Sequence, residues 1–188
     1  MKQKLTTKKI VLVALMAALT CIGSYLRVVV PISIGGNSAF HLGNIFCALS
    51  GILLGPWLGG LSAGLGSLLY DVLFYPDYIS ECWITFLTKG AYGLVAGMIA
   101  FSGKKEVGYL KAVLATLAGA LTYAALYLAK SYFYSGLLVG GLTPDAAWLS
   151  VIGKLPATIF NAAVAIIFAP ILAAAIKTAL KRNHLSLE

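Results

Sequence analysis

The chain has 188 residues, of which 60% are hydrophobic and only 11% are charged, whereas a soluble domain has about 25% charged residues. This composition excludes an ordinary soluble domain and indicates a polytopic helical membrane protein in contact with the lipid bilayer. A net charge of +8 would suggest a nucleic-acid partner in a soluble protein. Here the distribution of basic loops explains it, so we expect no nucleic-acid partner.

Six membrane helices are predicted, and we expect them to form a single integral membrane domain over residues 1–188. A helical crossing needs about 20 apolar residues, and such stretches recur between segments that contain Pro, Gly or charges, such as PISIGGNSAF and YPDYIS. The fold class is therefore all-α, a six-transmembrane-helix bundle. The predicted helices span about 8–30, 41–55, 57–75, 83–102, 107–135 and 148–180.

Basic residues predict how the bundle is oriented. They gather before the first helix, around the connection between the fourth and fifth helices, and at the end of the sixth helix. With six crossings all these groups lie on one side, which the positive-inside rule assigns to the cytoplasm together with both termini. The residues are Lys2, Lys4, Lys8, Lys9, Lys104, Lys105, Lys111, Lys177, Lys181 and Arg182.

The other charged groups lie towards the opposite, outer side in this topology. The cations are Arg27, Lys89, Lys130 and Lys154, and most of the acids are there too: Asp71, Asp77, Glu81 and Asp145. The predicted bundle is therefore polar on its outer side and sealed towards the inside. We interpret Arg27 as an anchor at the membrane interface.

Lys89 lies in the body of the fourth predicted helix, in the stretch ECWITFLTKG. A charge at that depth costs about 2.5–3.5 kcal/mol on insertion scales, so it needs a partner or a ligand. The alternative to a ligand is a structural pair with Asp71 or Glu81. Similarly, Lys154 has Asp145 or Asp71 as possible partners, and Lys130 has the alternative of extending to the outer interface.

Helical spacing places polar residues in stripes on several helices, and lipid cannot satisfy such stripes. We therefore predict that they converge on a cavity for a small, flat, polar molecule, with rings to stack on and Lys and Asn to bind heteroatoms. An aromatic belt at the interface is the alternative role of the tyrosines. The candidate ligand-binding residues are His41, Asn44, Asp71, Glu81, Trp83, Thr85, Lys89, Tyr92, Tyr127, Lys130, Lys154, Thr158 and Asn161.

Other classes of membrane protein find less support in the sequence. No HExxH motif or clustered acidic motif indicates an enzyme, and we expect no catalytic residue, metal or cofactor. An autonomous secondary transporter would have inverted repeats and broken helices, and neither is clear. A structural scaffold would give the buried lysines no purpose beyond pairing.

Several stretches together resemble the substrate-binding (S) component of energy-coupling factor (ECF) vitamin transporters, in particular its riboflavin-type branch. They are the Ala14–Ala18 pattern in VALMAALT, the segment PISIGGNSAFHLGN, the glycine-rich ILLGPWLGGLSAGLGSLLYD, and ECWITFLTKGAYGLVAG and KLPATIFNA. The resemblance extends over essentially the whole chain.

That resemblance implies a prokaryotic cell-membrane protein that binds one micronutrient near its outer face, under the first loop. It implies docking through Ala14 and Ala18 on a membrane coupling subunit that carries two ATPases. The chain itself has no G-x-x-x-x-G-K-[ST] phosphate loop. Riboflavin, a vitamin B6-like compound, a pyrimidine and a queuine-like base all remain candidate ligands. The outer lysines slightly favour a vitamin B6-like or pyrimidine ligand, since they suit acidic or phenolic oxygens.

Overall fold

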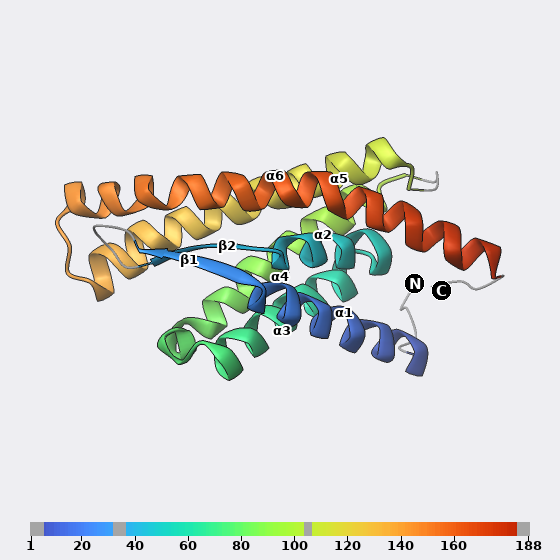
Figure 1. Cartoon of the computed structure of the whole chain (residues 1–188), viewed down its shortest axis with the longest axis horizontal. Coiled ribbons are helices and arrows are strands. Elements are labelled where there is room, and N and C mark those ends of the chain that lie inside the picture. The colour runs from blue at the N-terminus through green and yellow to red at the C-terminus, as the bar shows by residue number, and fades with distance from the viewer. Residues whose placement is uncertain (1–5, 32–36, 104–106, 184–188) are drawn as a thin grey trace.

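The computed structural model describes residues 6–31, 37–103 and 107–183, so Lys2, Lys4, Lys104 and Lys105 lie outside the described residues. Within those ranges the chain forms six α-helices and one β-hairpin (Figure 1). The helices are α1 (Thr7–Tyr25), α2 (Gly43–Leu54), α3 (Pro56–Phe74), α4 (Cys82–Ala100), α5 (Tyr109–Ala129) and α6 (Pro144–Arg182). A 3₁₀ helix, η1 (Pro76–Glu81), precedes α4, and a π-helix, η2 (Lys130–Val139), continues α5.

Five helical segments are long and apolar enough to cross a membrane, which confirms a helical, multi-pass membrane protein. They are α1, α3, η1 with α4, α5 with η2, and α6. Helix α2 has only 12 residues, about 18 Å at 1.5 Å per residue, whereas the hydrocarbon core is about 30 Å thick. A sixth full crossing therefore stays a prediction.

The first predicted helix was wrong beyond residue 25. α1 ends at Tyr25, and strand β1 (Arg27–Pro31) pairs antiparallel with β2 (Asn37–His41), with Arg27 opposite His41. The β-branched run Val28–Val30 followed by Pro31 favours an extended backbone over a helix. An otherwise helical chain thus carries a hairpin between α1 and α2.

Two other boundaries differ from the predicted ones for identifiable reasons. Helix α6 begins at Pro144, not 148, because the Thr143 hydroxyl caps the Ala146 N–H at 3.4 Å and proline is well tolerated in a first turn. Helical structure after α5 runs to Val139, beyond the predicted end at 135, because the chain continues as a π-helix.

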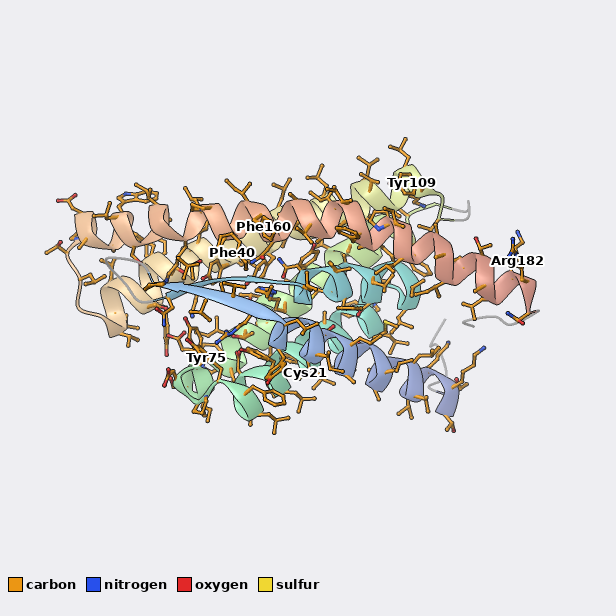
Figure 2. All side chains as sticks on the ribbon, in the orientation of Figure 1. Cys21, Phe40, Tyr75, Tyr109, Phe160 and Arg182 are labelled. Carbon is orange, nitrogen blue, oxygen red and sulfur yellow. The ribbon has the colours of Figure 1, made fainter. Side chains whose placement is uncertain are left out.

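The helices form a bundle in which α5 and α6 run along one side and α1, α3 and α4 along the other (Figure 1). The first turn of α1 and the last turn of α6 lie at the same end of the molecule. Figure 2 places Tyr109 and Arg182 at that end and Tyr75 at the opposite end. The basic groups at these helix ends therefore gather at one end of the bundle, as predicted. The membrane face to which that end belongs stays a prediction.

Glycines let α2, α3 and α4 approach one another closely. A Cβ on Gly59 would lie 2.5 Å from the Gly51 Cα, and one on Gly93 would lie 2.6 Å from the Gly59 carbonyl oxygen. A Cβ on Gly97 would lie 2.5 Å from backbone atoms of Pro56. In each case the obstacle is backbone, which cannot move aside as a flexible side chain does. These contacts fix α4 against α3, and α4 carries Lys89.

We predict that Gly93→Ala destabilises the bundle by about 1–3 kcal/mol, the usual cost of overpacking. The matched control is Gly90→Ala on the same helix, where the nearest atom to the new Cβ is the Gly60 oxygen at an acceptable 3.4 Å. Thermal unfolding in detergent micelles measures the difference. Equal melting temperatures for the two variants would contradict the close packing of α3 and α4.

Candidate functional site

A partly open cavity is lined by residues of both hairpin strands and of α3, α4, α5 and α6. Its polar lining contains many of the residues that the sequence predicted for ligand binding. The structure brings these together there: His41, Asp71, Thr85, Lys89, Tyr127, Lys130, Thr158 and Asn161. These residues come from β2, α3, α4, α5 with η2, and α6, so the predicted polar stripes do meet at one cavity.

The remaining predicted residues do not line the cavity. Asn44 and Tyr92 lie behind it and contact groups that do, and Glu81 binds Lys130. Trp83 is 54% exposed and its ring meets Tyr134 edge-on, with centroids 6.4 Å apart. Lys154 is buried on α6 outside the lining, and no carboxylate of the described residues lies within ion-pair distance of it.

Lys89 is 5% exposed and lines the cavity. Its ammonium donates to Asn44 Oδ1 and lies 4.0 Å from the centre of the Tyr123 ring. Neither Asp71 nor Glu81 forms an ion pair with it. Because an ammonium has three N–H donors, at least one is left for a molecule in the cavity.

Asp71 carries the other deeply buried charge of the cavity and is 6% exposed. Its Oδ2 atom is buried and has no hydrogen-bond partner among the described residues. The Thr85 side chain, from the facing helix α4, lies next to the carboxylate. A buried acceptor without a donor is costly, and a ligand that supplied an N–H or O–H would remove that cost.

Aromatic rings form one wall of the cavity. Tyr92, Tyr123 and Tyr127 stack in a row, with centroids 6.0 and 5.7 Å apart and both pairs of planes 21° from parallel. Tyr123 and Tyr127 line the cavity, while Tyr92 supports them from behind. Such a wall is suited to stacking with a flat ring. The position of these tyrosines therefore favours a role in ligand binding over a role in an aromatic belt at the interface.

Arg27 was not predicted to belong to the site. Its guanidinium lies 3.9 Å from the centre of the Tyr75 ring and 5.1 Å from that of Tyr70, and it lines the cavity. Arg27 was missed because the sequence predicted a helix there. Arg27 instead begins strand β1, and its side chain lines the cavity. Sequence reasoning also missed Tyr75 and Tyr78, which come from the η1 region, and the run VVVP was the available signal for the strand.

Asn161 binds the backbone of the hairpin. Its Oδ1 accepts the His41 N–H at 2.9 Å, and its Nδ2 donates to the Ala39 carbonyl at 2.9 Å. The side-chain amide thus replaces a neighbouring strand along the edge of β2. Phe40 and Phe160 meet edge-on beside it, with centroids 5.0 Å apart (Figure 2).

His41 is neutral in this environment. Burial lowers its pKa well below the usual value, and the nearby charges of Lys89 and Arg27 lower it further. The Gly43 N–H donates to Nδ1 at 3.2 Å, so the proton of the neutral ring is on Nε2. The imidazole therefore has an N–H to donate while adding no positive charge.

Lys130 pairs with Glu81 instead of extending to the interface. The Ser135 hydroxyl also donates to Glu81 at 3.3 Å, and the Lys130 ammonium lies 5.2 Å from the Tyr78 ring centre. This cluster joins the end of η1 to η2 at the side of the cavity. Lys130 therefore has its charge balanced within the protein.

One face of α1 is left unpacked. Ala14 and Ala18 are exposed together with Val11, Leu15 and Ile22. On the opposite face, Ala17 packs so closely on α3 that a Cβ on Gly66 would lie 2.3 Å from its carbonyl oxygen. The predicted docking residues thus occupy an accessible face rather than the interior of the bundle.

These features define a multi-pass membrane protein with a polar cavity within its helices. The chain matches the family model "ECF-type riboflavin transporter, S component" over residues 4–178 and belongs to that family. It is thus a substrate-binding membrane subunit of an ECF transporter. S components bind a small vitamin-like substrate and associate with a membrane coupling subunit and ATPases.

A relative from Pyrococcus woesei carries the description "Uncharacterized protein in gap 3'region". It is 29% identical to this chain over 119 residues, which cover 63% of this chain and 74% of the relative. Its description names no ligand.

We predict that Asn161→Leu loosens the hairpin, because it removes two hydrogen bonds from the edge of β2. Loss of buried partners costs about 1–3 kcal/mol, so amide exchange over residues 37–41 should accelerate by about 5- to 150-fold. Hydrogen exchange with mass spectrometry in detergent measures this. Asn183→Leu, at the exposed end of the same helix, is the control. Unchanged exchange in Asn161→Leu would contradict the clamp.

Proposed function

We propose that this protein captures one small, flat, polar micronutrient from the outer side of a prokaryotic cell membrane and delivers it to a coupling subunit with two ATPases. The candidates are a vitamin B6-like compound, a pyrimidine, riboflavin and a queuine-like base. The observation that carries the proposal is Lys89, a buried ammonium that lines the cavity without a carboxylate partner.

Three features support binding over a purely structural role for the polar groups. The Lys89 ammonium and the Asp71 carboxylate both line the cavity but do not pair. The stacked tyrosines offer a flat apolar surface. The hairpin covers the cavity and is itself held by a buried side chain, Asn161. A scaffold would gain stability by letting the two charges meet, since unpaired buried charges are costly.

The proposed orientation places the cavity end outside and the cluster of basic helix ends in the cytoplasm. Among the described residues, that cluster has Lys8 and Lys9 in the first turn of α1, Lys111 in the first turn of α5, and Lys177, Lys181 and Arg182 in the last two turns of α6. The positive-inside rule supports this orientation. Both termini would then be cytoplasmic, and the ligand would enter from the opposite side.

The first prediction for this function concerns the ligand itself. Native mass spectrometry of gently purified protein, followed by a thermal-shift screen of vitamins and bases, should reveal a molecule of a few hundred daltons. Lys89→Met should weaken its binding about 10-fold or more, because hydrogen bonds to charged groups contribute about 1.5–3 kcal/mol. Lys181→Met, an exposed lysine at the other end, is the control. A panel in which no compound stabilises the wild type would refute the proposal.

The second prediction concerns docking. Ala14→Trp and Ala18→Trp should leave ligand binding unchanged but abolish uptake by cells that contain the coupling subunit and ATPases, because a large ring on α1 would prevent close helix contact. Leu121→Trp places the same ring on an exposed position of α5 (62% exposed) and should transport normally. Normal uptake by both alanine variants would exclude this face of α1 as the docking surface.

A further inference from the structure

The cavity holds two buried, opposite charges that do not meet. Lys89 and Asp71 are 5% and 6% exposed, both line the cavity, and their charged atoms are farther apart than an ion pair allows. Buried opposite charges normally pair directly, since each compensates the desolvation of the other. Here each charge is presented to the space between the helices instead.

Each charge also has unused hydrogen-bonding capacity. The Lys89 ammonium donates to Asn44 and keeps at least one further N–H. Asp71 Oδ2 has no donor among the described residues. Among the described residues, therefore, Asp71 Oδ2 has no donor, and Lys89 has an N–H left for a further acceptor.

The geometry of α4 gives the approximate spacing between the surroundings of Asp71 and of Lys89. Thr85 lies beside Asp71, and Lys89 follows Thr85 by one turn of α4, a rise of about 6 Å. Positions 85 and 89 are thus one helical turn apart, a spacing that two polar groups at different positions of one small ring can span. Tyr123 lies at the same level, because its ring is in contact with the Lys89 ammonium. A flat ring stacked on Tyr123 and Tyr127 would reach both charges with its edges.

We propose that the ligand is a dipolar 3-hydroxypyridine, bound with the anionic oxygen on ring carbon 3 at Lys89 and with its protonated ring nitrogen donating to Asp71 Oδ2. This assignment rests on the proposed function and specifies its substrate class. The zwitterionic ring carries both required groups on one small aromatic frame. Its charges cancel, as do those of Lys89 and Asp71, so the complex adds no net charge to the buried site.

Riboflavin and an aminopyrimidine match the two charges of the site less fully. The ring system of riboflavin is uncharged and offers Lys89 only a carbonyl oxygen. An aminopyrimidine supplies a donor for Asp71 but no anionic oxygen for Lys89. A phosphate ester would bring about two negative charges to a cavity where Lys130 is already paired with Glu81. These differences make the charge pattern of the ligand testable.

The test is a set of cycles in which one ligand group and one side chain are removed separately and together, with affinities measured by titration calorimetry on full-length protein in detergent. The ligands are pyridoxine, its N-methylpyridinium analogue, which keeps both charges but has no N–H, and its 3-O-methyl ether, which lacks the anionic oxygen and at neutral pH also the ring N–H. The variants are Lys89→Met and Asp71→Asn. Exposed Lys181→Met and Asp77→Asn are the controls.

We expect wild type to bind pyridoxine about 10- to 100-fold more tightly than either analogue, the effect of one hydrogen bond to a charged group. Asp71→Asn should lose the preference over the N-methyl analogue, and Lys89→Met should keep it. Each variant should lose only part of the preference over the ether, which lacks both groups. Such a pattern identifies which group meets which charge. The comparison of analogues on wild type alone tests the proposal even if a variant fails to fold.

The proposal is overturned if pyridoxine does not bind, or if wild type binds all three ligands equally. It is also overturned if riboflavin binds more tightly than pyridoxine and Lys89→Met and Asp71→Asn leave that affinity unchanged. In that last case the protein is still a micronutrient-binding subunit, so the proposed function stands. If no compound of the vitamin and base panel binds either, the proposed function falls as well.

Discussion

The site depends on the contacts that hold the buried Lys89 ammonium of α4 between α2 and α5. Asn44 from α2 accepts its hydrogen bond, and Tyr123 from α5 offers the face of its ring. Both partners can reach Lys89 only because α4 lies close to its neighbours. Gly93 of α4 packs on Gly59 of α3, so the small residues of one part of the bundle position the charge in another.

A β-hairpin within a membrane protein needs hydrogen-bond partners for the backbone groups along its free edge. An extended strand leaves backbone N–H and C=O groups along its edge, and lipid cannot bind them. β1 pairs with one edge of β2, and the amide of Asn161 binds Ala39 and His41 on the other. One residue of α6 therefore lets non-helical backbone cover a cavity inside a helical bundle. The same contact ties the cover of the cavity to α6.

Hydropathy and helical spacing were sufficient to predict a helical, multi-pass membrane protein and polar stripes that meet at one cavity. Lys89, Asp71 and Tyr127 line the cavity because they lie on helices whose polar faces have nowhere else to turn. The strand was missed because VVVP continues an apolar run, and hydrophobicity alone does not distinguish a buried strand from a helix. That error removed Arg27 from the predicted site. The roles of Asn44 and Asn161 depend on contacts between distant segments, which no local pattern specifies.

The two ends of the bundle are built differently, and this difference bears on how the protein works. At the end away from the hairpin, Leu49, Ile52 and Leu53 pack with Ala100, Ala112 and Ala115 into an apolar cluster. A dipolar ligand crossing that cluster would lose its partners at Lys89 and Asp71 and gain none. For the function that we propose, release on the far side would therefore require the bundle as a whole to change its position or shape. The unpacked face of α1, with its small and aliphatic side chains, is suited to binding a coupling subunit. In our proposal, the partner ATPases drive this change through that contact.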